Sequence, residues 1–82
     1  MIVTVDKNTE SRRVWRAKAW DALNAPTVDV ELRRKSILVQ EPDLSVNWSC
    51  CGAVPLENAE AFAETMTEAV RVAAEMEKEL KP

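Results

Sequence analysis

Between Pro55 and Leu80 the chain contains no Gly and no further Pro, and its apolar residues recur in alternating steps of three and four. Pro55 suits the first turn of a helix, where a missing N–H breaks no hydrogen bond. Glu57 follows in the same turn, where the helix dipole favours a negative charge. We therefore predict a helix of about 24 residues, roughly 36 Å long. Its heptad-type apolar seam comprises Ala59, Phe62, Met66, Ala69, Ala73, Met76 and Leu80.

Two interpretations of this seam stay open. The whole stripe can pack on the apolar face of a sheet, as amphipathic helices usually do. Alternatively, a helix of this length exceeds what a three- or four-stranded sheet needs as cover, and its end meets a second copy of the chain. The candidate dimer seam then consists of Ala73, Met76 and Leu80. Alanines bury little area each, so such a dimer need not be tight.

Four other segments have strand character. Met1–Val5 is rich in β-branched residues, and residues 6–9 after it favour a turn. In Thr27–Leu32 and Leu44–Cys51, apolar and polar residues alternate, which predicts strands with one apolar and one polar face. Ser36–Glu41 contains three consecutive apolar residues, and we expect a further strand there. The last three of these segments make an antiparallel meander, and the sheet is predicted to have three to four strands.

The segment Ser11–Asn24 is predicted as a shorter helix. Its four alanines favour a helix, Ser11 can cap the N-terminus, and Pro26 would end it. A strand through Val14–Trp20 is the alternative. The only glycine, Gly52, is expected to end the last strand in a backbone conformation that a Cβ would oppose.

The fold class is therefore α+β, in the order β-α-β-β-β-α, with residues 1–82 forming a single small domain. The meander packs on the long C-terminal helix. Over roughly residues 11–80, the order helix, three strands, helix resembles the double-stranded-RNA-binding domain. That family carries a basic cluster at the start of its second helix, whereas this chain has Pro55–Leu56–Glu57–Asn58 there. The resemblance therefore implies a fold and no function.

The composition argues against catalysis. The chain has no His, the commonest general base and metal ligand, and a single Gly, too few for a phosphate-binding loop. Cys50 and Cys51 are sequence neighbours and cannot supply four zinc ligands. We expect no enzyme, no cofactor and no metal. We also expect both thiols to be free, with Cys50 in the core and Cys51 exposed, because adjacent strand residues point to opposite faces.

The expected setting is the reducing cytoplasm, since the cysteines form no disulfide framework. The chain has no apolar stretch that approaches the roughly 20 residues of a membrane helix, and it does not begin like a secretory signal. We expect no membrane partner.

Two charged surfaces are candidates for partner binding, although both can simply be solvated. Glutamates one turn apart on the long helix could meet a basic partner, and basic residues near aromatic ones in Ser11–Asn24 could bind nucleic acid. The candidate surface residues are Glu60, Glu64, Glu68, Arg12, Arg13, Arg16 and Trp20.

From these features we expect a non-enzymatic protein-interaction module, homodimeric, of the accessory or inhibitor type found in phages and mobile elements, which acts by binding a protein complex. The alternative is a nucleic-acid-binding or transcription-regulatory module that uses the basic first helix.

Overall fold

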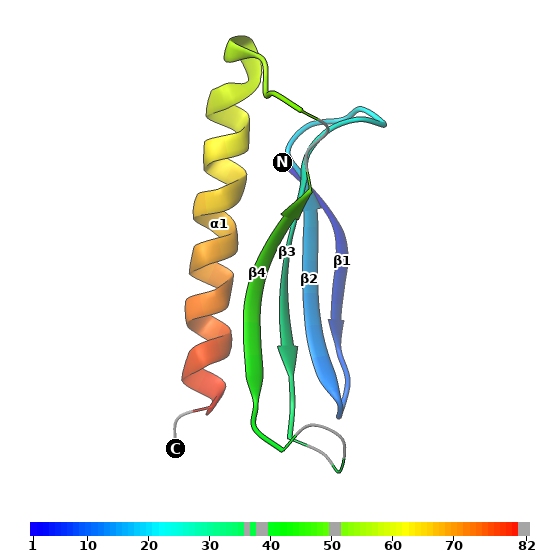
Figure 1. Cartoon of the computed structure of the whole chain (residues 1–82), viewed down its shortest axis with the longest axis vertical. Coiled ribbons are helices and arrows are strands. Elements are labelled where there is room, and N and C mark those ends of the chain that lie inside the picture. The colour runs from blue at the N-terminus through cyan, green and yellow to red at the C-terminus, as the bar shows by residue number, and fades with distance from the viewer. Residues whose placement is uncertain (36, 38–39, 50–51, 81–82) are drawn as a thin grey trace.

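The computed structural model describes residues 1–35, 37, 40–49 and 52–80. Its elements follow one another as β1 (Ile2–Asn8), β2 (Arg12–Lys18), β3 (Thr27–Arg33), β4 (Asp43–Ser49) and α1 (Leu56–Leu80). The strands form one antiparallel four-stranded sheet in the order β1-β2-β3-β4, so each strand pairs with its neighbour in sequence (Figure 1). The predicted class, an α+β meander on a long C-terminal helix, is confirmed.

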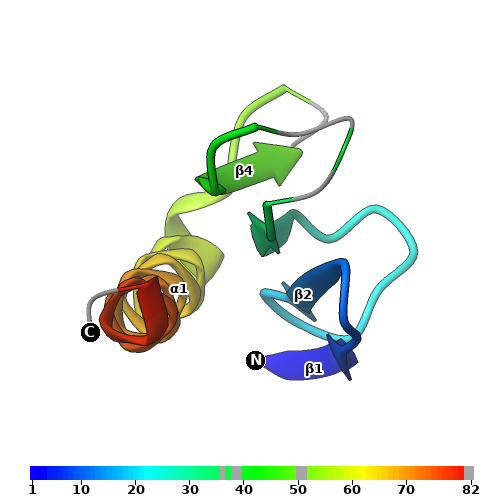
Figure 2. The same cartoon turned by 90° about the horizontal axis from the view of Figure 1, so that it is seen from below.

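The molecule has two layers, because α1 covers one face of the sheet and leaves the other open (Figure 2). The strand register places Trp15 of β2, Val30 of β3 and Val46 of β4 side by side. Residues two positions away along each strand share that face, which is the face that α1 covers. The helix lies mainly over β3 and β4 and touches β2 near its end, whereas in the described part of the chain it makes no close approach to β1.

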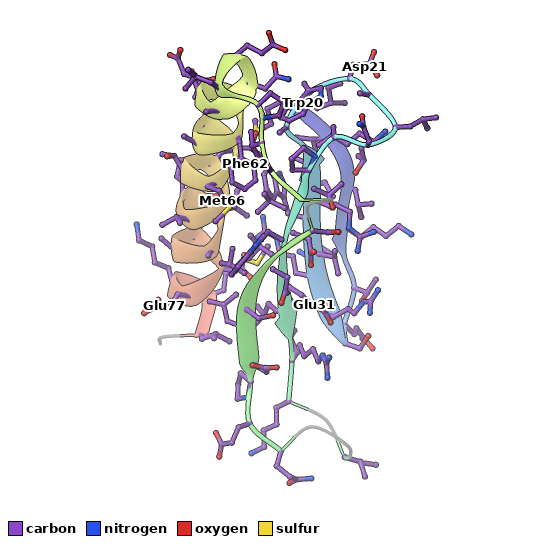
Figure 3. All side chains as sticks on the ribbon, turned by 45° about the horizontal axis from the view of Figure 1, so that its top comes forward. Trp20, Asp21, Glu31, Phe62, Met66 and Glu77 are labelled. Atoms are coloured by element: carbon purple, nitrogen blue, oxygen red, sulfur yellow. The ribbon has the colours of Figure 1, made fainter. Side chains whose placement is uncertain are left out.

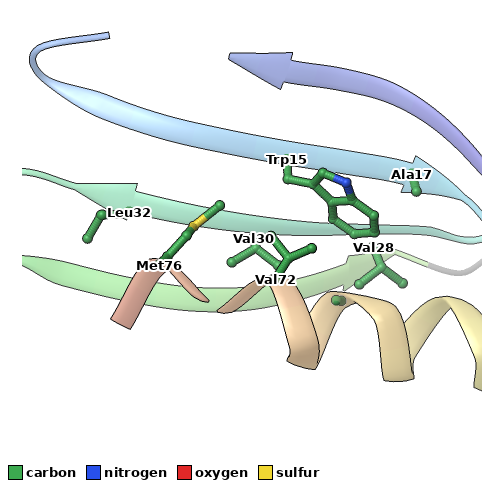
Figure 4. Close-up of a cluster of buried hydrophobic side chains, with 8 residues drawn as sticks. Trp15, Ala17, Val28, Val30, Leu32, Val72 and Met76 are labelled. Carbon is green, nitrogen blue, oxygen red and sulfur yellow. The ribbon is translucent and has the colours of Figure 1, made fainter. Parts of the chain in front are cut away.

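The core lies between α1 and the central strands. Val28, Val30 and Leu32 of β3 are fully buried, beneath a helix stripe that ends at Met76 (Figure 4). The buried helix residues are Thr65, Ala69, Val72 and Met76. Thr65 is the polar member, and its hydroxyl donates a hydrogen bond of 2.8 Å to the carbonyl oxygen of Ala61. This bond lets a polar side chain enter the core without an unsatisfied donor.

The prediction of a helix at Ser11–Asn24 is wrong, because Arg12–Lys18 forms the strand β2. Trp15 and Ala17 face α1, and the intervening Arg16 points to the open face. The alternative strand, Val14–Trp20, comes close to these bounds. Two neighbouring strands satisfy the backbone of β2 on both sides, and this pairing outweighs the modest helix propensity of its alanines. Since the element order is β-β-β-β-α, the likeness to the double-stranded-RNA-binding domain also fails.

The other strand predictions are largely confirmed. β1 continues through the expected turn as far as Asn8, and β3 and β4 match Thr27–Leu32 and Leu44–Cys51 to within two residues at each described end. The prediction of a strand at Ser36–Glu41 is wrong for the residues of this segment that the structure describes, since residues 37, 40 and 41 form bends. Cys50 and Cys51 lie outside the described residues, and so do Ser36, Leu38 and Val39.

The helix prediction is confirmed, but the C-terminal end of the helix does not project past the sheet. α1 runs along the strands and not across them, and it is its N-terminal turns that extend beyond the strand ends (Figure 1). Met76 is consequently fully buried against the core, Ala73 is half-buried, and only Leu80, 38% exposed, lies near the surface. The premise for a dimer seam at Ala73, Met76 and Leu80 therefore does not hold.

Truncation of Met76 tests this placement. Met76→Ala should lower the free energy of unfolding by about 2–5 kcal/mol, because a buried side chain is lost and a cavity remains. Leu80→Ala, at the exposed C-terminal end of α1, should lower the free energy of unfolding by clearly less. Denaturant titration of both variants measures the difference. Equal losses would contradict the burial of Met76.

Gly52 has a φ of 87°, as the sequence predicts for the corner between β4 and α1. An added Cβ would meet no atom within 4 Å, so a substitution is opposed by the backbone conformation and not by a clash. Gly52→Ala should therefore cost on the order of 1 kcal/mol of stability, measured by denaturant titration. Unchanged stability would show that the corner adopts an ordinary backbone conformation.

Candidate interaction surfaces

The two edges of the sheet differ in how they are protected. In β1 the register shifts between Val3 and Val5, and the charged Asp6 and Lys7 follow. Bulges and charges are the usual devices that stop an edge strand from pairing with another chain. β4 pairs with β3 in a continuous register over all of its 7 residues, and its only charged residue is Asp43, at its start. The free edge of β4 is therefore regular and lacks these devices.

Trp48 is the most exposed aromatic residue on this edge, with 65% of its surface accessible. It lies opposite the fully buried Val28 of β3, so it belongs to the face of the sheet that α1 covers. Leu44 and Val46 of the same strand share this face and are half-buried. A large side chain this exposed on a regular edge strand is a typical anchor for a partner.

The helix has two chemically different flanks on either side of its buried stripe. At about 100° per residue, Met66, Val70 and Ala73 fall on one side of that stripe, and Glu68, Glu75 and Glu79 fall on the other. The exposed Glu77 lies on the first side, between Ala73 and Val70 around the helix. We call Met66, Val70 and Ala73 the apolar flank, and the three glutamates of the other side the acidic flank. Val70 stands out because it is 59% exposed.

The contacts of Glu79 fix which way each flank faces. Its carboxylate pairs with Arg13, which lies on β2, and with Arg34, which follows β3, the latter at 3.4 Å. The acidic flank therefore turns toward β2, and the apolar flank turns toward β4. The molecule thus has an apolar strip formed by Leu44, Val46 and Trp48 of β4 and by Met66, Val70 and Ala73 of α1. We call this strip, together with the free edge of β4, the β4 surface.

The predicted acidic surface lies on the side of α1 remote from β4. Glu60 and Glu64 are exposed, and Glu68 is half-buried beside Arg71. The guanidinium Nε of Arg71 donates to both carboxylate oxygens of Glu68 at 3.0 Å, and this hydrogen bonding holds the pKa of the Glu68 carboxyl below its ordinary value. Arg71 also pairs with Glu75, so the stripe is partly neutralised within the helix itself.

The predicted basic surface is divided between the two faces of the sheet. Arg13 lies on the helix face, whereas Arg12 and Arg16 lie on the open face. Arg12 pairs with Glu31 at 3.8 Å, and Glu31 also accepts a bond of 3.1 Å from Arg33. Arg16 lies directly opposite Asp29 in the register. Acidic residues of β3 thus interrupt the positive charge of β2.

The tryptophans near these arginines are not a stacking platform. Trp15 is buried in the core. Trp20 is half-buried in the connection after β2, at the same end of the molecule as Phe62 (Figure 3). The structure therefore does not join the predicted residues into one site: the glutamates lie along α1, the arginines are divided between the two faces of the sheet, and Trp20 lies in the connection after β2. In the sequence, Leu44, Val46 and Trp48 of the β4 surface were predicted only as the apolar face of a strand, because the sequence does not show that β4 is an edge. Ala73 was predicted as part of the dimer seam.

Among the described residues, no group of three or more Cys, Asp or Glu side chains could hold a metal ion. Over the same described residues, no helix is long and apolar enough to span a membrane. No family model, curated protein or solved structure gives a significant match to this chain.

The Glu68–Arg71 pair gives a pH prediction. Because the pKa of Glu68 is lowered in the folded state, the pair stabilises the fold above the unfolded pKa of about 4.3, and this contribution is lost as the pH falls through the folded pKa. In a carboxyl NMR titration, Glu68 should titrate at a higher pH in Arg71→Gln than in the wild type. Added salt should reduce the difference, since the pair is exposed to solvent. Identical titration curves would contradict the pairing.

Proposed function

We propose that this chain is a non-enzymatic protein-interaction module that binds a protein partner through the β4 surface. The observation that carries the proposal is the contrast between the two sheet edges: β1 has a bulge and charges, whereas β4 has a regular register and an exposed Trp48. An edge strand presents a row of unpaired N–H and C=O groups to which an extended chain can add a further strand.

The side chains of the β4 surface suit such a partner. Backbone hydrogen bonds supply affinity in strand addition, and alternate side chains supply specificity. Trp48 offers a large apolar anchor, and the flank of α1 beside it offers Val70 and Met66 as further apolar contacts. Tryptophan is enriched among the residues that contribute most to binding at protein interfaces. The partner therefore presents an extended segment with apolar side chains facing α1.

The biological class remains the one expected from the sequence. The chain is an accessory or inhibitor protein of the phage or mobile-element type, which acts by occupying a surface of a larger protein complex. This part of the proposal rests on the small size and on the lack of His in the chain.

The alternative is a nucleic-acid-binding module that uses the open face of the sheet. Arg12, Arg16 and Lys18 of β2 lie on that face, which gives phosphate groups a place to bind. Asp29 and Glu31 on the adjacent strand weaken this alternative, because they offset the positive charge that such binding needs.

Selection of peptides from a random display library tests the proposal. Peptides that bind the wild type should lose affinity for Trp48→Glu by about tenfold or more, because the anchor is lost and a charge is placed in the apolar strip. Val3→Glu is the matched control: Val3 is 47% exposed on the same face of the sheet, but on the opposite edge, and this variant should bind normally.

The proposal fails if no selected peptide needs Trp48 for its binding.

An electrophoretic shift assay at low and moderate salt tests the alternative, that the chain binds nucleic acid. A shift with a steep salt dependence that Arg16→Glu abolishes and Trp48→Glu leaves intact would favour nucleic acid.

A further inference from the structure

We propose that the protein partner of the β4 surface is a second copy of this chain, and that two β4 strands pair antiparallel about a two-fold axis at Val46. This inference rests on the proposed function and adds the identity of the partner. The eight strands of the two copies would then form one continuous sheet.

The register follows from the bounds of β4. Residues directly opposite each other in an antiparallel pair lie on the same face of the sheet, so a two-fold axis must pass beside a residue that faces its own copy. Val46 is the middle residue of Asp43–Ser49, and an axis there pairs all 7 strand residues. An axis beside Ser45 or Asn47 would displace the strands by two residues and leave strand ends unpaired.

The axis at Val46 also makes the side chains complementary. Leu44 of one copy then lies opposite Trp48 of the other on the helix face, so a half-buried apolar residue covers the exposed indole. On the open face, Ser45 lies opposite Asn47. Asp43 lies opposite Ser49, and no like charges oppose each other along the strand pair. Apolar cross-strand pairs stabilise a sheet, and opposed like charges would destabilise it.

The helices support the same arrangement. A two-fold axis perpendicular to the sheet leaves both α1 helices on the same face, with the flank nearest β4 turned toward the other copy. That flank is the apolar one, with Val70 and Met66, whereas the contact between Glu79 and Arg13 holds the acidic flank on the side of β2. The acidic flanks of the two copies therefore stay apart, and the apolar flanks face each other across Leu44, Val46 and Trp48. Glu77 is the charged residue on that side of the described helix, and its side chain is exposed.

Sedimentation of the full chain at a series of concentrations tests the dimer. The wild type should be dimeric at high micromolar concentration, and Trp48→Glu and Val70→Glu should each raise the dissociation constant by about tenfold or more, since the two-fold axis counts each change twice. Leu23→Glu is the control, because Leu23 is 102% exposed and lies in the connection between β2 and β3, outside β4 and α1, so this variant should remain dimeric.

Disulfide cross-linking tests the register in a Cys50→Ser/Cys51→Ser background. With the axis at Val46, the two copies of residue 46 have Cα atoms about 4.5–5.5 Å apart, within reach of a disulfide. The two copies of residue 44 are displaced by four residues, about 14 Å, which is too far. Val46→Cys should therefore form a cross-linked dimer under mild oxidation, and Leu44→Cys should not.

Each outcome decides between the inference and its failure. A wild type that sediments as a monomer at high micromolar concentration, or a dimer that Trp48→Glu and Val70→Glu leave intact, would overturn the second-copy inference. Cross-linking at residue 44 but not at residue 46 would overturn the register. If Trp48→Glu does not fold, Val70→Glu and the cross-links still decide. The peptide selection judges the proposed function separately, because a monomer can still bind other proteins through Trp48.

Discussion

The packing of α1 on β3 is the contact on which the rest of this structure depends. Val28, Val30 and Leu32 are fully buried by a single helix, and the other strands are arranged around them. A helix with its side chains is about 10 Å wide, whereas four strands at a spacing of about 4.8 Å make a wider sheet. One helix therefore cannot cover the whole sheet: α1 lies mainly over β3 and β4 and leaves β1 without cover. Val3 on β1 remains partly uncovered for this reason, and on β4 the large side chain of Trp48 is also left exposed.

The elements with an unambiguous pattern could be predicted from the sequence, and the ambiguous one could not. α1 combines a helical period with the absence of Gly and Pro, and β3 and β4 alternate strictly, so tertiary contacts only reinforce their local preference. In β2, the alanines favour a helix while the alternation of Trp15, Arg16 and Ala17 favours a strand. The hydrogen bonds to β1 and β3 decide between them, and these bonds connect residues far apart in the sequence.

The candidate surfaces were harder to predict than the fold for a related reason. The alternation in β4 predicts which side chains share a face, but a strand is an edge or a centre only through its pairing with other strands. The alternation puts Trp48 on the apolar face of its strand, where a core position is expected, and the structure leaves it exposed. The helix end was misjudged because the helix length was compared with the width of the sheet. The orientation of α1 along the strands makes Met76 part of the core.

The difference between the two edges also bears on how large an assembly can become. A chain with two regular edges could add copies at both, and its sheet could grow without limit. Here β4 is regular, but β1 has a register shift between Val3 and Val5 and the charges of Asp6 and Lys7. When two β4 strands pair about a two-fold axis, both ends of the joined sheet are β1 strands. Their bulges and charges oppose further addition, so an assembly built on β4 closes at two copies.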